Sequence, residues 1–314
     1  MIQHSLKLFS GSSCPELARN IAKYLKIPVS EMILTRFACG EVYARPIESV
    51  RGCDVYVVQT TTHRVNEDLM ELFVMLDAMK RSFAAKIHVV MPYYAYSRQD
   101  RVAMPREPIS AKLVADLISA AGSDHVITMN LHSDQEQGFF DYPVDNLTAG
   151  KIFADYFRSK KLRDLVVVSP DAGGAKKANV FADLIGADLA IMHKSRPRHN
   201  VAEIKQIIGH VAGKTCIVYD DMIDTAGTVC ETMEALKRFK ANKEVYLAAT
   251  HAVFSQPAIE RLKKACFHEV VVTDTVPLKK DDCFSGLKVL SVAPLLAKII
   301  MNVHDAKPIS KLSE

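Results

Sequence analysis

The chain has 314 residues, about twice the usual length of one domain, so two domains of ordinary size are expected. Hydrophobic residues make up 49% and charged residues 24%, which fits a folded globular protein and excludes a disordered chain. The net charge of +4 is spread along the chain without a basic block, so nucleic acid is not an expected partner.

The cysteine pattern and the hydropathy bear on where the protein works. The seven cysteines never stand at C-x-x-C spacing, and their odd number argues against a disulfide framework. A reducing cytoplasm is therefore the expected location. No stretch reaches the roughly 18 uncharged apolar residues that a membrane span needs, so neither a membrane partner nor export is expected.

The predicted elements alternate between strand and helix. Short apolar runs rich in β-branched residues predict buried strands at 54–60, 86–94, 124–131, 165–171, 215–221, 244–254 and 269–275. Apolar residues at helical spacing predict helices at 66–82, 109–122, 227–242 and 257–266. This alternation predicts an α/β fold in which helices cover both faces of mostly parallel sheets.

The alternating pattern runs twice along the chain. A polar segment at 141–151 separates the two passes, so we expect an N-terminal domain over 1–147 and a C-terminal domain over 148–314, whose last helix could return to the first domain. In open parallel sheets, ligands bind at the carboxyl ends of the strands. The residues directly after each apolar run are therefore the candidates for chemistry.

The segment IVYDDMIDTAGT (217–228) carries the strongest chemical signal. Its carboxylates and small residues are Asp220, Asp221, Asp224, Thr225, Ala226, Gly227 and Thr228. Amide N–H groups at the start of a helix, with the two threonine hydroxyls, suit a phosphate dianion. The adjacent carboxylates can accept hydrogen bonds from two vicinal hydroxyls. From the residues alone, an ordinary helix cap at Asp224 with two solvated carboxylates remains the alternative.

This segment resembles the phosphoribosyl-diphosphate motif that phosphoribosyltransferases share with ribose-phosphate pyrophosphokinases. From about Leu6 to Val303 the chain resembles the pyrophosphokinases. The resemblance implies two phosphoribosyltransferase-like domains, the first binding ATP and the second ribose 5-phosphate. It implies transfer of the diphosphate of ATP, with Mg²⁺, to the C1 hydroxyl of ribose 5-phosphate, for nucleotide biosynthesis. It also implies a homo-oligomer, commonly a hexamer built from dimers.

Two segments resemble the ATP-contacting parts of that family, RFACGEVYARPIESVRG (36–52) and PYYAYSRQDR (92–101). The ATP-binding residues implied are Phe37, Cys39, Gly40, Glu41, Arg98, Gln99, Asp100 and Arg101. An aromatic ring and a carboxylate suit adenine, and guanidinium groups suit phosphates. Where the family usually has Ser followed by Asp or Asn, this chain has Ala38 and Cys39, a departure that bears on nucleotide selectivity.

A third segment, NLHSDQEQGFFDYPVDNL (130–147), resembles the magnesium segment of the family. The resemblance implies that His132 and Asp171 contact the metal, with Asp171 lying in SPDAGGAKKA (169–178). Because magnesium prefers oxygen ligands, contact of His132 with either the metal or a phosphate is expected. Asn130 stands where the family commonly has Asp.

The basic stretch HKSRPRHNVAEI (193–204) predicts an exposed, mobile loop, because it is broken by proline and has little apolar content. Lys194 and Arg196 match the catalytic pair of the family, and Arg196 would also contact ribose 5-phosphate. Positive charge near a diphosphate accelerates its transfer. No covalent nucleophile is evident in these motifs.

Regulation and two rival functions stay open from the sequence. Ser49 and Arg51 resemble positions that bind activating phosphate or inhibitory ADP, whereas Ser310 in the C-terminal tail aligns only loosely. One rival is a phosphoribosyltransferase, which would consume the product instead of making it. The other is a non-catalytic regulatory paralogue, which should have lost the site residues that this chain keeps.

Overall fold

The computed structural model describes residues 4–198 and 201–310, without the side chains of 194–198 and 201–205. It forms two compact units. The first contains the described residues up to Thr148, together with Thr275–Pro277 and the chain from Val292. The second contains Ala149–Asp274 and Leu278–Ser291. The expected C-terminal domain over 148–314 is therefore not continuous, because its last helix packs in the first unit.

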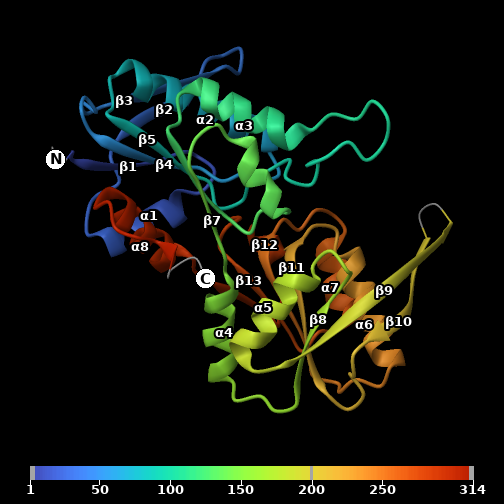
Figure 1. Cartoon of the computed structure of the whole chain (residues 1–314). Coiled ribbons are helices and arrows are strands. Elements are labelled where there is room, and N and C mark those ends of the chain that lie inside the picture. Colours follow the sequence, from blue (N-terminus) through green and yellow to red (C-terminus); the bar gives the residue numbers. More distant parts are fainter. Residues whose placement is uncertain (1–3, 199–200, 311–314) are drawn as a thin grey trace. The chain divides into compact units, whose positions relative to one another are not determined.

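A five-stranded parallel sheet forms the centre of the first unit. Its strands are β1 (Leu6–Ser10), β4 (Asp54–Val58), β5 (Lys86–Val90), β6 (His125–Met129) and β7 (Val144–Leu147), in the order β1-β4-β5-β6-β7. Since neighbouring parallel strands need a crossover, helices α1 (Pro15–Leu25), α2 (Val65–Arg81) and α3 (Ser110–Ala121) connect them (Figure 1).

Helices cover both faces of this sheet. Alternate side chains of a strand point to opposite faces. Val55 and Val57 share a buried core with Met75 and Met79 of α2 and with residues of α3. On the other face, the Tyr56 hydroxyl donates to the carbonyl of Ile300 (3.4 Å) in α8 (Ala293–His304).

A two-stranded antiparallel hairpin accompanies the first sheet. Strands β2 (Met32–Arg36) and β3 (Val42–Pro46) pair with Arg36 opposite Val42. The turn between them contains Gly40 at φ 94°, a backbone conformation that favours glycine. The Gly40 N–H donates to the Phe37 carbonyl (2.8 Å), and the Phe37 N–H donates to the Glu41 carbonyl (2.9 Å). The turn thus fixes the expected adenine-binding residues on a hairpin tip.

The second unit contains a seven-stranded sheet in the order β10-β9-β8-β11-β12-β13-β14. The strands are β8 (Leu165–Ser169), β9 (Asp188–Arg198), β10 (Val201–Ile208), β11 (Thr215–Ile223), β12 (Val245–Ala252), β13 (Glu269–Thr273) and β14 (Leu287–Leu290). All neighbours are parallel except β9 and β10.

Four helices cover the two faces of this second sheet. They are α4 (Gly150–Ser159), α5 (Ala175–Ile185), α6 (Gly227–Arg238) and α7 (Ala258–Ala265). Residues of α6 and α7 share one apolar core with Val166 and Val218. On the opposite face, Phe181 of α5 stacks on Tyr219, with ring centroids 4.4 Å apart. The predicted α/β fold with parallel sheets covered by helices is confirmed.

The segment at 193–204 is not a loop, and this expectation was wrong. Its described backbone lies in β9 and β10, which pair antiparallel beyond the end of β8 (Figure 1). Pro197 falls where the register shifts between the pairs Val201–Arg198 and Glu203–Ser195. A proline is tolerated at such an irregularity, because no ladder hydrogen bond is required there.

Candidate functional site

The carboxylates of the second unit lie on β11, and the strand is longer than the sequence suggested. Asp220 and Asp221 were expected at its end, but β11 continues to Ile223, which pairs with Ala252. The extension has a partner because β12 is itself a fully buried strand of eight residues. Asp220 and Asp221 are therefore held on a paired strand, near its carboxyl end.

Burial and neighbouring charge act on these carboxylates. Burial raises the pKa of Asp220 well above its usual range, the charge of Asp221 raises it further, and Asp171 adds a smaller effect. The Asp221 N–H donates to Asp220 Oδ1 (2.9 Å), and Lys177 Nζ lies 4.0 Å from Asp221 Oδ2. The site thus concentrates negative charge that a cation or hydroxyl donors can satisfy.

The loop after β11 leads directly into α6. It contains Asp224, exposed Thr225 and buried Ala226, and α6 begins at Gly227. Ala226 has a left-handed backbone at φ 59°, and Arg261 Nη1 donates to the Thr225 carbonyl (3.0 Å). The first amides of α6, which have no partner within the helix, therefore follow the carboxylates immediately, as an anion site requires.

Asp171 belongs to the same unit and follows β8, the strand beside β11. Its Oδ1 accepts a hydrogen bond from the Gly174 N–H (3.0 Å), and its carbonyl accepts one from Ser169 Oγ (2.7 Å). Because Asp171 raises the pKa of Asp220, the two carboxylates act on each other electrostatically. The structure therefore brings Asp171 together with the 220–228 segment.

In the first unit, the loop after β5 presents most of its predicted ATP-binding residues to solvent. Arg98, Gln99 and Arg101 are exposed, and Asp100 is half-buried. Gln99 Oε1 accepts a hydrogen bond from Ser110 Oγ (2.6 Å), and its carbonyl accepts one from the Ala111 N–H (3.2 Å). Gln99 is thus tied to the start of α3, which anchors the middle of the loop.

His132 is exposed and follows β6, in the same unit as the Arg98 loop. Its backbone N–H donates to Ser97 Oγ (2.9 Å), and the Ser97 hydroxyl donates to the buried Glu136 carboxylate (2.7 and 2.9 Å). Burial raises the pKa of Glu136. Through Ser97, these contacts link the loop that carries Arg98 to the segment that carries His132.

Ser97 and Glu136 were not singled out from the sequence. The available signal was the S-x-x-E pattern of a capping box at Ser133 and Glu136, which the structure forms. Such a pattern indicates a local turn, whereas the contact with Ser97 joins residues 39 positions apart.

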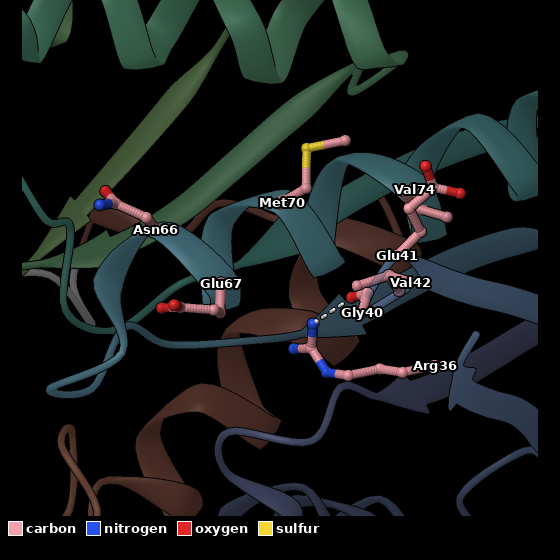
Figure 2. A pocket seen from close by; sticks show the side chains of 8 residues that line it. All are labelled: Arg36, Gly40, Glu41, Val42, Asn66, Glu67, Met70 and Val74. Carbon is pink, nitrogen blue, oxygen red and sulfur yellow. Dashed lines mark hydrogen bonds between the residues drawn. The ribbon is translucent and has the colours of Figure 1, made fainter. Parts of the chain in front are cut away.

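A cavity of about 510 Å³ lies between the β2–β3 hairpin and α2 (Figure 2). Its lining residues are Arg36, Gly40, Glu41, Val42, Asn66, Glu67, Met70 and Val74. Phe37 stands on the hairpin turn, 54% exposed, with its ring edge-on to Tyr43 at 5.7 Å. Cys39 is also exposed. The cavity wall thus combines apolar side chains with the carboxylates of Glu41 and Glu67.

The expected catalytic pair is placed only by its backbone. Lys194 and Arg196 lie on β9, in the part of the hairpin beyond β8. Their side chains are outside the described residues.

The described residues also bear on metal binding. Among residues 4–198 and 201–310, no three His, Cys, Asp or Glu side chains are grouped so that they could hold a metal by themselves. His132 lies in the first unit and Asp171 in the second. A magnesium ion usually takes one or two protein carboxylates and completes its shell with water and phosphate oxygens. Asp171 fits that kind of donor set.

Within residues 4–198 and 201–310, no helix has the length and apolar character needed to cross a bilayer.

Comparison with known proteins assigns both parts of the chain. Residues 6–122 match the sequence profile of the N-terminal domain of ribose phosphate pyrophosphokinase, and residues 197–314 match that of the phosphoribosyl synthetase-associated domain. The chain is 51% identical to the ribose-phosphate pyrophosphokinase of Caldanaerobacter subterraneus, covering 98% of each chain. It is 50% identical to that of Synechococcus elongatus, covering 98% of this chain and 94% of the relative.

A solved structure supports the same assignment. The phosphoribosylpyrophosphate synthetase from Mycobacterium smegmatis superposes with a TM-score of 0.90 at 45% identity, over 96% of this chain and 99% of that one. Sequence and fold agree over nearly the full length, and the chain belongs to the ribose-phosphate pyrophosphokinase family.

Proposed function

We infer that this chain is a ribose-phosphate diphosphokinase, which transfers the β,γ-diphosphate of ATP to the C1 hydroxyl of ribose 5-phosphate. The products are phosphoribosyl diphosphate, a precursor for nucleotide biosynthesis, and AMP. The observation that carries this inference is identity of about half of all residues with named pyrophosphokinases over 98% of the chain.

ATP is assigned to the first unit. Arg98 and Arg101 suit the phosphates, because a guanidinium offers a planar set of donors. Phe37 offers an exposed ring for the base, while Gly40 and Glu41 line the cavity beside it. Cys39, Gln99 and Asp100 are the remaining residues that we assign to ATP binding.

Ribose 5-phosphate is assigned to the second unit. The start of α6, with Thr225, Ala226, Gly227 and Thr228, supplies backbone donors for the 5-phosphate. The carboxylates of Asp220, Asp221 and Asp224 accept hydrogen bonds from the vicinal hydroxyls of the sugar. These roles are supported by the order of the elements, because the carboxylates at the end of β11 are followed directly by the start of α6.

In the reaction, the C1 oxygen of the sugar attacks the β-phosphorus of ATP. A new oxygen–phosphorus bond forms, the bond to the α-phosphate oxygen breaks, AMP leaves, and the hydroxyl proton passes to solvent. Lys194 and Arg196 are assigned to stabilise the negative charge that spreads over the phosphate oxygens, and Arg196 also to contact the sugar phosphate.

The family is one of diphosphotransferases, which generally need a divalent metal, and we propose Mg²⁺. Bound to the nucleotide, Mg²⁺ would neutralise phosphate charge. Asp171 is assigned as its carboxylate ligand, and His132 as a contact to the metal or to a phosphate oxygen. We further propose a cytoplasmic homo-oligomer, a hexamer by family resemblance, with regulation by phosphate and ADP through Ser49 and Arg51.

The test is a coupled assay for AMP formation with ATP, ribose 5-phosphate and Mg²⁺, with and without inorganic phosphate. AMP and phosphoribosyl diphosphate should form in equal amounts. A phosphoribosyltransferase would instead consume phosphoribosyl diphosphate in the presence of a base. A regulatory paralogue would show neither reaction, so a second assay with phosphoribosyl diphosphate and a nucleobase separates it from a phosphoribosyltransferase.

A further inference from the structure

The N-cap residue of α6 cannot cap the helix with its side chain. This residue is Ala226, whose side chain is a methyl group, whereas helices usually begin with Ser, Thr, Asp or Asn. The first turn of α6 therefore depends on other groups to satisfy its amides. Ala226 also has a left-handed backbone, with φ 59° and ψ 12°. Because this conformation is unfavourable for a residue with a Cβ, the contacts around Ala226 must hold it.

Hydrogen bonds lie on both sides of this left-handed residue. On the C-terminal side, the Cys230 N–H donates to the Ala226 carbonyl (3.1 Å). On the N-terminal side, Arg261 Nη1 donates to the Thr225 carbonyl (3.0 Å). The first is a backbone bond of the kind that every α-helix forms, but the second comes from a side chain of another helix, α7. Arg261 therefore ties the turn before α6 to a neighbouring element.

The packing of α7 places Arg261 beside the start of α6. The buried residues of α7 are Ala258, Leu262 and Ala265, and they share one apolar core with residues of α6. Arg261 is three positions after Ala258 and four before Ala265, so its side chain leaves α7 next to this buried stripe. A Cβ at Gly227 would lie 3.4 Å from Arg261 Nη1. The guanidinium therefore lies against the first residue of α6.

The hydrogen bond from Arg261 sets the direction of one peptide group. In a trans peptide, the carbonyl and the N–H of the next residue point in opposite directions. Since the Thr225 carbonyl points to Arg261, the Ala226 N–H points away from it. A rotation of this peptide by about 180° would replace that donor with a carbonyl oxygen, the negative end of the peptide dipole. An anion on the side away from Arg261 would then meet an acceptor instead of a donor.

The charge of Arg261 acts on the same turn. Burial raises the pKa of the Cys230 thiol to about 11, and the charge of Arg261 opposes that rise. The positive charge is therefore felt in the first turn of α6. The strand before this turn carries Asp220 and Asp221, whose negative charges would repel a phosphate. A cation bound to the turn offsets part of that repulsion.

We propose that Arg261 is a positioning residue for the 5-phosphate of the sugar substrate. Its guanidinium holds the Thr225 carbonyl on the side of α7, so that the Ala226 N–H faces the phosphate. Arg261 acts through the backbone and does not touch the reacting atoms. It stands 36 positions after Thr225, outside the 220–228 segment. The inference rests on the proposed function, because it requires ribose 5-phosphate to bind at that segment.

The primary test is the kinetic pattern of Arg261→Ala. The KM for ribose 5-phosphate should rise by about tenfold to a hundredfold, the range that misplacement of a binding group by about 1 Å costs. The KM for ATP should stay within about twofold, because ATP is assigned to the other unit. Arg261→Lys keeps a positive charge and an N–H donor for the Thr225 carbonyl, so it should recover most of the affinity. A wild-type KM for ribose 5-phosphate in Arg261→Ala would overturn the proposal.

A matched control separates the contact with the loop from the loss of one charge on α7. Lys264 is exposed in the last turn of the same helix, three positions after Arg261. Lys264→Ala should leave the KM for both substrates unchanged, and both variants should melt close to the wild type because both side chains are exposed. Equal increases in the KM for ribose 5-phosphate would overturn the proposal, since the lost charge alone would then explain them.

A double-mutant comparison tests whether Arg261 acts through the loop. If Arg261→Ala misplaces the phosphate, it also weakens the contact that Thr228 would make, so its effect should add only partly to that of Thr228→Val. Full additivity would contradict positioning, because it would indicate an independent contact of Arg261 with the phosphate. If the wild-type chain formed no AMP, the proposed function would fail instead. Calorimetric titration with ribose 5-phosphate would still test Arg261, because it measures binding alone.

Discussion

At the scale of single residues, the properties of the carboxylates and of Thr228 in the candidate site depend on their immediate neighbours. Asp220 and Asp221 are adjacent in sequence and held on one strand, so the charge of one raises the pKa of the other. Sugar hydroxyls, an ammonium group or a metal ion can each relieve that repulsion. Thr228 belongs to the first turn of α6, where backbone donors lack partners within the helix.

Replacement of Thr228 by Val should weaken ribose 5-phosphate binding and leave ATP binding nearly intact. The change removes one hydroxyl donor to a charged phosphate, which is worth on the order of 1.5–3 kcal/mol. Calorimetric titration of each substrate measures both effects. Thr232→Val, one turn further along the same helix and fully buried, is the control and should change neither affinity directly. Equal losses for ATP and the sugar would remove this loop from the sugar-phosphate site.

Cys39 makes a separate prediction about nucleotide choice. It is exposed on the hairpin turn, at a position that the family resemblance assigns to the base. Cys39→Asp should therefore increase the preference for ATP over GTP, measured as the ratio of kcat/KM values, because a carboxylate accepts from the adenine amino group and repels the guanine carbonyl. Cys283→Asp adds the same charge at an exposed position elsewhere and should leave the ratio unchanged. An unchanged ratio in Cys39→Asp would contradict the prediction.

At the scale of elements, the spacing of apolar residues correctly predicted the strands and helices that are buried in the core. Strands such as β4 and β13, and helices such as α2 and α6, appear where apolar runs or helical spacing placed them. The sequence did not predict the β9–β10 ribbon, because its basic residues and Pro197 lack the apolar alternation of a buried strand. The described backbone of that element is held by pairing between the two strands. The long strand β11 was missed for a related reason, since its polar end is stabilised by β12.

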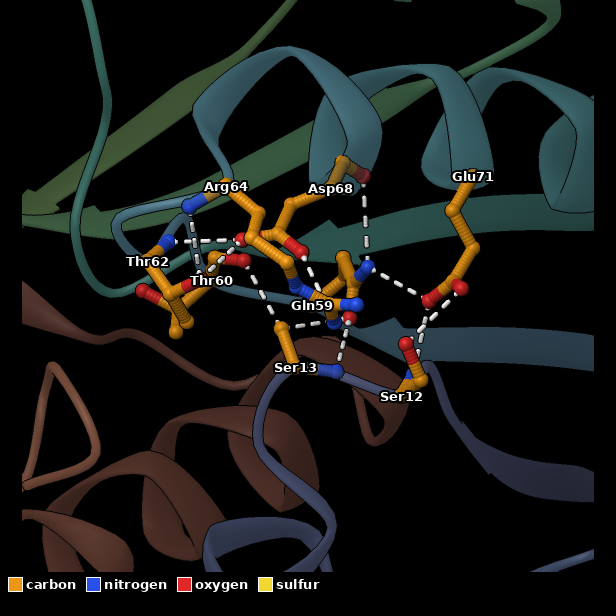
Figure 3. Close-up of polar contacts among 8 residues, drawn as sticks. All are labelled: Ser12, Ser13, Gln59, Thr60, Thr62, Arg64, Asp68 and Glu71. Atoms are coloured by element: carbon orange, nitrogen blue, oxygen red, sulfur yellow. Dashed lines mark hydrogen bonds and ion pairs between the residues drawn. The ribbon is translucent and has the colours of Figure 1, made fainter. Parts of the chain in front are cut away.

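In the candidate site too, some features could be predicted from the sequence and others could not. The carboxylates and small residues of 220–228 were identifiable because they are adjacent in sequence. Ser97 and Glu136 are 39 positions apart, and Ser12 and Glu71, which are also hydrogen-bonded (Figure 3), are 59 positions apart, so no local pattern reveals these contacts. Their hydrogen bonds exist only once parallel strands bring distant loops to one edge of the sheet.

The β9–β10 ribbon carries Lys194 and Arg196, whose replacement tests their catalytic role. Lys194→Ala should lower kcat by a factor of about a hundred to a thousand, the cost of losing one preorganised charge in the transition state, with little change in either KM. Stability should hold, because the ribbon extends beyond the core strands. Steady-state kinetics and thermal melting of Lys194→Ala and Arg196→Ala provide the measurement.

Lys288 offers a matched control for the ribbon variants. It is an exposed lysine on β14, at the opposite edge of the same sheet, so Lys288→Ala should leave kcat unchanged. A near-normal kcat in Lys194→Ala would remove Lys194 from the catalytic residues. A collapsed melting temperature would identify it as structural.

At the scale of the whole molecule, the two ends of the sequence meet in the first unit. Helix α8 returns from the C-terminal part of the chain to a sheet face that carries Tyr56, His88 and His125. His304 Nδ1 of α8 lies 3.1 Å from Asp54 Oδ2. Stability of this unit therefore depends on residues separated by some 250 positions. The contact face contains an unusual number of buried titratable groups.

His88 lies at the centre of that face. Its Nδ1 is 3.0 Å from His125 Nδ1, and His125 Nε2 is 3.0 Å from Asp145 Oδ2. The Tyr56 ring stacks on the His88 ring, with ring centroids 4.3 Å apart. Burial, with smaller contributions from the charges of His125, Lys86 and His304, lowers the pKa of His88 from 6.5 to about 3. The side chain is therefore neutral in the folded protein and becomes protonated only on unfolding in mild acid.

Acidification should destabilise the protein through His88. Between pH 6.5 and about 3 the unfolded state binds the proton and the folded state does not, so stability is complete above pH 6.5 and falls as the pH decreases. From pH 7 to pH 5 the loss is about 2 kcal/mol, at about 1.4 kcal/mol for each unit of pKa difference. His88→Asn keeps a donor for His125 but cannot titrate, so its melting temperature should fall less over this pH range. His63→Asn removes an exposed histidine of the same unit and should retain the wild-type pH dependence. Melting curves from pH 5 to pH 7 with parallel slopes for wild type and His88→Asn would show that other groups cause the acid sensitivity.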